Sequence, residues 1–238
     1  MTYKVCLEED HKVTGAYSVL AVDESKDPTK LTADLKLCYL NYGMAETDWK
    51  DFSKYKKICL DKNEDWDHEY WVDVTKDLWI SRIKSKVLEA KKRGFNGIWL
   101  DNGDIYWWTL EHHKHLASNV YKSMIQICSW IKNQGMTLIL NGADTFVSKL
   151  LDEKKECCID GVNQETVFTR ITSYSGNGKF SAQKPSEQKF YTNYCKRCKR
   201  HGLKVFLLEY TTDKNLILKI QQFCADVDGY YITESIKL

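Results

Sequence analysis

The sequence has few prolines and no long apolar run. Only two of its 238 residues are proline, and few long gaps separate the predicted elements. No stretch approaches the ~18 consecutive apolar residues of a membrane-spanning helix, and the first ten residues lack the apolar core of a secretory signal. We therefore expect a single domain over residues 1–238 and no membrane partner. The cellular location stays open, because a leader could have been removed. The oligomeric state also stays open.

An excess of charge of one sign is also lacking. Thirty-five Lys and Arg residues stand against 33 Asp and Glu residues, and neither Gly-rich phosphate-loop pattern occurs. This balance argues against a nucleic-acid partner held by bulk electrostatics. The nine cysteines include one Cys-x-x-Cys pair, Cys195 and Cys198, with no second pair to complete a four-thiolate zinc site. We interpret the thiols as mostly reduced and structural.

A repeated unit of helix, glycine and apolar strand is present along the chain. Apolar residues recur at helical spacing over residues 79–93, 116–134 and 187–201, and a glycine closes each stretch. A glycine directly after a helix is typical of a left-handed helix end. The continuous apolar run that follows each glycine indicates a strand buried on both faces, as in a parallel sheet covered by helices.

Other apolar or aromatic runs complete a count of eight strands. The predicted strands cover residues 17–22, 35–40, 70–74, 98–100, 137–140, 159–164, 205–208 and 229–233. Eight alternating units in this length match a (β/α)8 barrel, whereas an open doubly wound sheet normally has fewer strands. We predict an α/β protein with a single (β/α)8 TIM barrel. Its first unit is expected to be irregular, because residues 24–34 leave little room for a full helix.

Each predicted strand ends at or near a carboxyl or amide side chain. In chain order these are Asp23, Asn41, Asp73, Asp101, Asn141, Glu165, Glu209 and Glu234. A single acid at such a place is commonly a helix N-cap or a solvated carboxylate, and this reading is favoured for Asp23 and Glu234. Eight such ends in one predicted barrel instead indicate a site, because barrel enzymes draw working residues from several strand ends.

Aromatic residues gather near the same strand ends, most densely in the segment GFNGIWLDNGDIYWW (94–108). Packing at the barrel rim explains about half of these rings, and Trp107 and Trp108 fit that role. Acids, amides and rings without a phosphate loop favour chemistry on a polyhydroxylated ligand. Hydrolysis of a glycosidic bond needs two carboxyl groups flanking the anomeric carbon.

An ordered set of motifs carries a family resemblance. The segments YLNYGMAE (39–46), YWVDV (70–74), GFNGIWLDNGDIY (94–106), LILNG (138–142), IDGVNQETVF (159–168) and KVFLLEY (204–210) resemble glycoside hydrolase family 114. The most specific pieces are LDNGDIY and DGVNQE, and the match spans residues 17 to 234. The resemblance implies a (β/α)8 barrel that acts as an endo-α-1,4-polygalactosaminidase, with a galactosamine or N-acetylgalactosamine polysaccharide as substrate and without a metal or other cofactor.

The same resemblance implies the site residues. The catalytic pair maps onto Asp101, after the fourth predicted strand, and Glu165, after the sixth. By analogy with other α-retaining barrels, Asp101 is expected to be the nucleophile and Glu165 the acid/base, although the reverse order stays open. The expected substrate-binding residues are Asp23, Asp73, Asp104, Tyr106, Asn141, Glu209 and Tyr210. One departure leaves the exact sugar open: the family commonly has an acid after the glycine of its second strand, where this chain has Met44 and keeps only Glu46.

Two alternatives compete with a two-carboxylate glycosidase. The first is a sugar-binding barrel without turnover, which would require one carboxyl group of the pair to be out of place. The second is a metal-dependent hydrolase that uses the cluster His112, His113 and His115 with an Asp. Histidine pairs at short spacing do bind metals, but these residues lie at the polar start of a predicted helix, where exposure to solvent is the commoner outcome.

Overall fold

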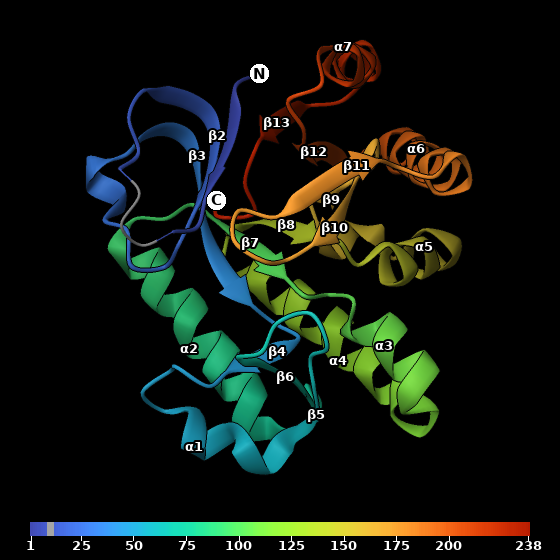
Figure 1. Ribbon diagram of the computed structural model, residues 1–238. Helices are drawn as coiled ribbons and strands as arrows, with labels where there is room; N and C mark the ends of the chain where they lie inside the picture. Colours follow the sequence, from blue (N-terminus) through green and yellow to red (C-terminus); the bar gives the residue numbers. More distant parts are fainter. Residues whose placement is uncertain (9–11) are drawn as a thin grey trace.

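Eight parallel strands form the centre of the protein in the computed structural model, which describes residues 1–8 and 12–238 (Figure 1). In spatial order the strands are β1 (Tyr3–Cys6), β2 (Ala16–Val22), β3 (Thr32–Asn41), β7 (Gly97–Asp101), β8 (Thr137–Asn141), β9 (Gly161–Glu165), β12 (Lys204–Tyr210) and β13 (Gly229–Thr233). Each strand pairs in parallel with the next. All eight carboxyl ends therefore lie on the same rim.

The first and last strands approach each other, so that the sheet is a nearly closed barrel. A Cβ atom added at Gly229 of β13 would lie 2.9 Å from the Cβ of Tyr3 in β1, so that only a glycine leaves room for this approach. Just beyond β1, the backbone N–H of Leu7 donates to the carbonyl of Leu238 over 2.7 Å. The predicted (β/α)8 fold is confirmed.

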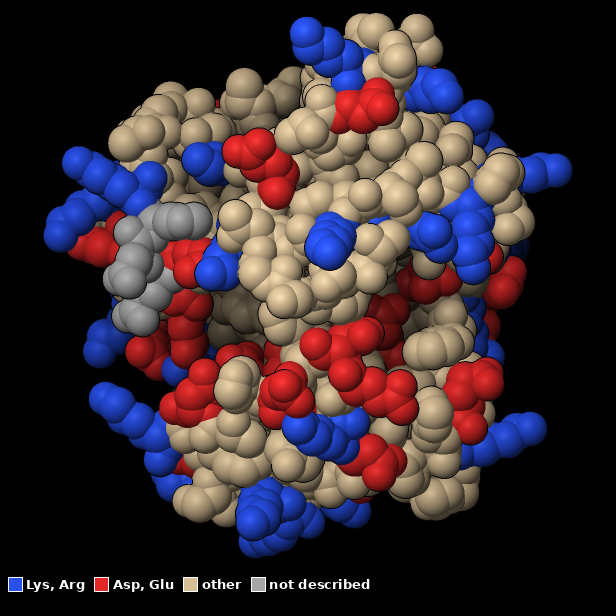
Figure 2. Space-filling view, viewed as in Figure 1, with Lys and Arg blue, Asp and Glu red and all other residues tan. Residues whose placement is uncertain are grey.

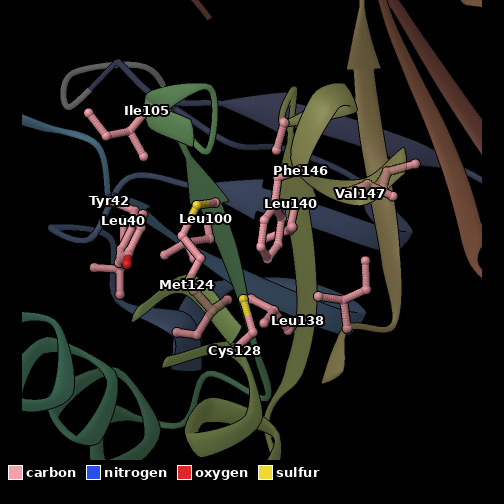
Figure 3. Packing of buried hydrophobic residues seen from close by; sticks show 14 of the residues in the cluster. Leu40, Tyr42, Leu100, Ile105, Met124, Cys128, Leu138, Leu140, Phe146 and Val147 are labelled. Atoms are coloured by element: carbon pink, nitrogen blue, oxygen red, sulfur yellow. The ribbon is translucent and has the colours of Figure 1, made fainter. Parts of the chain in front are cut away.

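Alternate residues of each strand face either the barrel interior or the helices. The interior cluster is formed by Tyr3, Val5, Val19, Ala21, Leu37, Trp99, Ile139, Phe206, Leu208 and Tyr210. Outward residues pack under the helices, as where Leu100 of β7 and Leu138 of β8 lie beside Met124 of the long helix 114–133 (Figure 3). This two-sided burial explains the continuous apolar runs of the sequence.

Helices cover the outside of the barrel (Figure 1). They are α2 (Asp77–Arg93), α3 (Ile105–His112), α4 (Lys114–Asn133), α5 (Asp144–Glu153), α6 (Pro185–Arg200) and α7 (Lys214–Phe223), with short 3-10 turns η3 (Glu156–Cys158) and η4 (Cys224–Asp226). The predicted left-handed end of α2 is present: Gly94 has φ 106° and its N–H donates to the carbonyl of Ala90. In the described part of the chain, no helix is long and apolar enough to cross a membrane.

One predicted barrel strand is wrong. Residues 70–74 overlap β6 (Glu69–Val72), which lies between β4 (Met44–Glu46) and β5 (Cys59–Lys62) in a separate antiparallel sheet, here called the side sheet. The barrel strand that was not predicted is β1, a four-residue segment that contains a lysine. The apolar run Tyr70–Val72 gave the stronger strand signal because the side sheet also buries Trp71 and Val72.

The expected irregularity of the first predicted unit is confirmed. Between β2 and β3 the chain forms only the 3-10 turn η1 (Pro28–Lys30) in place of an α-helix. Two insertions then rise from the carboxyl rim. The first holds the side sheet with α1 (Phe52–Tyr55) and η2 (Lys56–Ile58), and the second is the hairpin of β10 (Thr169–Ser173) and β11 (Lys179–Ala182).

All nine cysteines lie in the described part of the chain and are free. Cys195 and Cys198 are both buried in α6, so the Cys-x-x-Cys pair belongs to the packing beneath the helix. Burial raises the pKa of the Cys198 thiol to about 12, so this thiol is protonated at neutral pH.

Candidate active site

A cavity of about 420 Å³ opens at the carboxyl rim of the barrel. The ends of β7, β8, β9 and β12 supply Asp101, Asn141, Glu165 and Tyr210 to its wall. The side sheet and the β10–β11 hairpin extend the wall outward. Figure 2 shows acidic side chains gathered along the hollow that crosses this face.

Asp101 and Glu165 are joined by the amide of Asn141, which lies on the strand between them. Asn141 Nδ2 donates to Asp101 Oδ1 over 2.8 Å and to Glu165 Oε1 over 2.6 Å. Because both hydrogen bonds start from one nitrogen, the two accepting oxygens are at most about 5.4 Å apart, which is below the ~6.5–9.5 Å between the carboxyl groups of inverting glycosidases and agrees with a retaining arrangement. Asp101 and Glu165 are hereafter called the carboxyl pair.

Two tyrosines hold the other oxygens of the carboxyl pair. Tyr39 Oη donates to Asp101 Oδ2 over 3.0 Å, and Tyr210 Oη donates to Glu165 Oε2 over 2.7 Å. Each carboxyl group is therefore fixed by an amide and a phenol. Tyr39 was missed from the sequence; it lies two residues before the end of β3 and therefore on the same face as the strand-end residue Asn41, which was the available signal.

The chain turns sharply after each of the three central strands. Asn102, Gly142 and Thr166 directly follow the functional residues of β7, β8 and β9, and all three have positive φ (58°, 64° and 56°). This conformation costs a non-glycine residue about 1–3 kcal/mol and is typical of functional sites. The turns leave the side chains of Asp101, Asn141 and Glu165 at the rim.

Burial sets the protonation of the carboxyl pair. Burial first, and the charge of Asp101 second, raise the pKa of Glu165 to about 7, against hydrogen bonds from Asn141 and Tyr210 that lower it. Burial also raises the pKa of Asp101, while the Asn141 amide, the backbone N–H of Asn102 and the Tyr39 hydroxyl lower it. Glu165 thus holds its proton up to about neutral pH, beside the charge of Asp101.

Asp104 lies in the same cavity, three residues after Asp101. It accepts a hydrogen bond from the Ala143 N–H over 3.1 Å, and burial together with the charge of Asp144 raises its pKa to about 7. A Cβ atom at Gly142 would come within 2.5 Å of Asp104 Oδ2, so the glycine makes room for this carboxyl group. The expectation that Asp104, Asn141 and Tyr210 come together with the carboxyl pair agrees with their positions.

Four predicted substrate-binding residues, Tyr106, Asp73, Glu209 and Asp23, lie outside the cavity, which corrects their placement. Tyr106 packs in α3 against Tyr121 with ring centroids 5.3 Å apart. Asp73 follows β6 of the side sheet and binds the Thr75 hydroxyl and the Lys76 ammonium at the start of α2. Asp73 was misplaced because its segment belongs to the side sheet, and Tyr106 because α3 turns its ring into the packing beside Tyr121.

Glu209 is the third misplaced residue. It is fully buried and accepts hydrogen bonds from the Phe168 N–H, the Thr169 N–H and the Thr169 hydroxyl. Burial raises its pKa to about 7 against these bonds. Since successive residues of a strand point to opposite faces, Tyr210 can face the cavity only if Glu209 faces away.

Asp23 lies in an adjoining hollow rather than in the cavity itself. This hollow shares Tyr39, Trp66 and Glu69 with the cavity. Asp23 follows the end of β2 and accepts a hydrogen bond from the Ser25 N–H over 2.8 Å, as in a local turn.

The side sheet contributes an acid that the sequence reading missed. Glu69 of β6 lines the cavity and pairs across the ladder with Glu46 of β4. Burial first, then the charges of Glu46 and Asp101, raise the pKa of Glu69 to about 8. No sequence signal places this residue, because its position depends on how the side sheet folds over the barrel rim.

Two exposed aromatic residues meet at the edge of the cavity. Trp66, from the connection between β5 and β6, and Tyr174, directly after β10, have ring centroids 5.3 Å apart. Both line the cavity and are about 40% exposed (42% and 37%). The two insertions therefore touch each other through rings that also face the ligand space.

The histidine cluster lies away from the cavity, at the junction of α3 and α4. His112 stacks on Trp108 with centroids 5.1 Å apart, and His113 Nε2 lies 2.7 Å from Asp61 Oδ2. Within residues 1–8 and 12–238, no group of three or more His, Cys, Asp or Glu side chains is placed to hold a metal ion. The side chains of the cluster are engaged in ring packing and a hydrogen bond.

Comparisons with known proteins agree with this geometry. The model of a family described as glycoside-hydrolase family GH114 matches residues 1–236. Among solved structures, the glycoside hydrolase domain of PelA from Pseudomonas aeruginosa aligns with a TM-score of 0.76 at 10% identity, covering 99% of this chain and 94% of that one. Ega3 from Aspergillus fumigatus, solved in complex with galactosamine, aligns with a TM-score of 0.71 at 12% identity, covering 98% and 90%.

A more distant match shares only the barrel. An α-galactosidase from Thermus thermophilus aligns with a TM-score of 0.53 at 12% identity, covering 92% of this chain and 51% of that one. A comparison with curated protein sequences found no match.

Proposed function

Because the chain belongs to glycoside hydrolase family GH114 and is a glycosidase, we propose that it cleaves α-1,4-linked galactosamine or N-acetylgalactosamine polysaccharide, with residues 1–238 acting as one catalytic domain. The observation that supports the mechanism is the Asn141 amide, which hydrogen-bonds both Asp101 and Glu165 and so keeps them close enough for a retaining pair. The galactosamine found with the similar Ega3 fold supports the choice of sugar.

In this mechanism Glu165 and Asp101 act on opposite sides of the glycosidic bond. The Glu165 carboxyl group gives its proton to the glycosidic oxygen while Asp101 forms a bond to the anomeric carbon, and the leaving sugar departs as an alcohol. Water then attacks the anomeric carbon, Glu165 takes a proton from that water, and the bond to Asp101 breaks. The raised pKa of Glu165, about 7, supports the donor role, and the three hydrogen bonds that favour the ionised form of Asp101 support the nucleophile role.

The charge of the cavity supports an amine-bearing substrate. Glu69, Asp104 and Asp144 line it beside the carboxyl pair, and its described lining residues include no Lys or Arg. An ammonium group entering this space would lower the pKa of each nearby carboxyl group and gain from its negative charge. Asp104 and Asn141 are the proposed contacts at the reacting sugar, with Tyr210 holding Glu165.

The alternative of a sugar-binding barrel without turnover fits this geometry less well. It would leave the carboxyl pair without a function, although two separate strands, two tyrosines and one amide hold it in place. A binding surface needs neither the close spacing nor the proton held on Glu165.

Defined α-1,4-linked galactosamine and N-acetylgalactosamine oligomers test the proposal. We expect the wild-type protein to shorten at least one oligomer, and Asp101→Asn and Glu165→Gln to lose at least about 10³-fold in kcat, as measured by chromatography of the products. Asp152→Asn is the matched control, because this acid is exposed on α5 and pairs with Arg197. The first product formed should keep the α configuration by proton NMR.

Three results would contradict the proposal. Absence of cleavage of every oligomer would support the binding barrel instead. Undiminished cleavage by both variants would remove the carboxyl pair from the mechanism, and a β-configured first product would replace the nucleophilic role of Asp101 with that of a base.

A further inference from the structure

A chain of buried hydrogen bonds runs through the barrel interior below the cavity. Trp99 Nε1 of β7 donates to Tyr3 Oη of β1 over 3.2 Å, and Tyr3 Oη donates to Asn163 Oδ1 of β9 over 3.0 Å. Asn163 Nδ2 then donates to Asn141 Oδ1 of β8 over 2.6 Å. The chain therefore ends on the amide that bridges the carboxyl pair.

The donor at the start of this chain fixes the direction of every later bond. An indole N–H can only donate, so Tyr3 Oη accepts there and has its one proton left for Asn163. The Asn163 oxygen is thereby occupied, which leaves its NH₂ group facing Asn141. The Asn141 oxygen accepts this bond, and both of its N–H groups are then turned toward the carboxyl pair.

The opposite orientation of the Asn141 amide would be unfavourable at both ends. Its oxygen would face carboxylate oxygens of Asp101 and Glu165, and its NH₂ group would face the NH₂ group of Asn163. Unpaired and repelling polar groups at such depth cost more than the same groups in water. Asn163 and Trp99 are fully buried, so solvent cannot relieve the mismatch.

Stability alone does not account for these polar side chains. The neighbouring interior positions are apolar, for example Val5, Leu37, Ile139 and Phe206. Apolar groups of similar volume in place of both Tyr3 and Asn163 would avoid the cost of burying a hydroxyl and an amide. The polar side chains of Trp99, Tyr3 and Asn163 lie along one path, and this path leads to Asn141.

We infer that Tyr3 and Asn163 are positioning residues of the active site, which hold the Asn141 amide with both N–H groups on the carboxyl pair. The inference rests on the proposed glycosidase mechanism for its kinetic consequence. Its structural consequence is independent of turnover, because the Asn141 hydrogen bonds exist in the free protein.

The expected effect on the carboxyl pair has a definite sign. The Asn141 hydrogen bond lowers the pKa of Asp101 and of Glu165. A variant that frees Asn141 to turn therefore raises both pKa values. Both limbs of the pH profile of kcat/KM then move to higher pH.

The test uses two variants of the full chain. Tyr3→Phe removes a single oxygen atom, and Asn163→Leu removes the amide that contacts Asn141. We expect kcat to fall about 10- to 100-fold in Asn163→Leu and less in Tyr3→Phe, with KM nearly unchanged, since outer partners of a catalytic group typically have effects of this size. Carbon-13 NMR titration of the Asp and Glu carboxyl groups should show the pKa values of Asp101 and Glu165 rising in both variants.

Tyr194→Phe is the matched control, because this tyrosine is equally buried but lies in α6, outside the barrel. It should leave both pKa values and kcat as in the wild type. Unchanged pKa values in Tyr3→Phe and Asn163→Leu would overturn the inference, as would an equal loss of kcat in Tyr194→Phe. If the wild type cleaves no oligomer, the proposed function fails, but the NMR titration still decides whether Tyr3 and Asn163 hold the Asn141 amide. If Asn163→Leu does not fold, the same titration of Tyr3→Phe decides this question.

Discussion

Each oxygen of the carboxyl pair accepts a hydrogen bond from a side chain of a neighbouring barrel strand. Asn141 contacts one oxygen of Asp101 and one of Glu165, while Tyr39 and Tyr210 contact the other two. Donors stabilise the ionised form, and burial stabilises the neutral form. The balance leaves Glu165 with a pKa of about 7, and small changes in its donors therefore alter the fraction that is protonated at neutral pH.

Removal of the Tyr210 hydroxyl tests this balance. The Tyr210 hydrogen bond lowers the pKa of Glu165, so Tyr210→Phe should raise that pKa above about 7. The alkaline limb of kcat/KM then shifts to higher pH, while the acid limb, set by Asp101, moves little. A pH profile of oligomer cleavage measures both limbs. Tyr17→Phe is the control, because that hydroxyl donates to the Thr14 carbonyl at the opposite end of the barrel; an alkaline limb at or below its wild-type position in Tyr210→Phe would contradict the expectation.

The sequence was sufficient to predict Asp101, Asn141 and Glu165 as rim residues, because the first two end apolar strands and Glu165 directly follows the predicted strand 159–164. It was insufficient for Glu209, since its strand continues by one residue to Tyr210 and the pleat turns adjacent side chains to opposite faces. Asp101 ends β7 itself, whereas Glu209 precedes the end of β12. An error of one residue at a strand end therefore exchanges a cavity side chain for a buried one.

Among the elements, the two insertions complete the cavity that the barrel begins. The side sheet supplies Glu69 and Trp66, and the β10–β11 hairpin is followed by Tyr174. Neither insertion was predicted, because short antiparallel strands give the same apolar signal as barrel strands. The barrel strands between residues 97 and 210 were predicted well, since each follows a helix that ends in a clear amphipathic pattern.

Trp66→Ala should weaken the binding of long oligomers with little effect on the chemical step. Its ring lies at the cavity edge, against Tyr174 and beyond the carboxyl pair, where it can stack on a sugar distant from the reacting one. We expect KM to rise about 10-fold for long oligomers, about 1.4 kcal/mol, and less for the shortest cleaved oligomer. KM measured against oligomer length checks this. Trp107→Ala is the control, since that ring is similarly exposed (46%) on α3; equal changes at all lengths would place Trp66 at the reacting sugar instead.

At the scale of the whole molecule, acids are concentrated in the cavity, where burial disfavours their ionised form. The net charge is +2, yet five carboxyl groups line one cavity. Burial raises the pKa of Asp104 and Glu165 to about 7 and that of Glu69 to about 8. The free protein therefore holds protons near neutral pH that an unfolded chain would release, and stability is exchanged for a site that favours a cationic ligand.

This linkage predicts that the free energy of unfolding falls as pH rises from about 5 to 8. The folded protein binds more protons than the unfolded chain over this window, because the pKa of Glu69 is about 8 in the folded protein and its ordinary value is 4.5. Glu69→Gln imitates the protonated form, so it should unfold at higher urea concentration than the wild type at pH 8 and at a similar concentration at pH 5.

Asp67→Asn is the control, since that exposed acid has a lowered pKa beside Lys62. A wild-type stability that rises over this window would contradict the assigned protonation of the cavity.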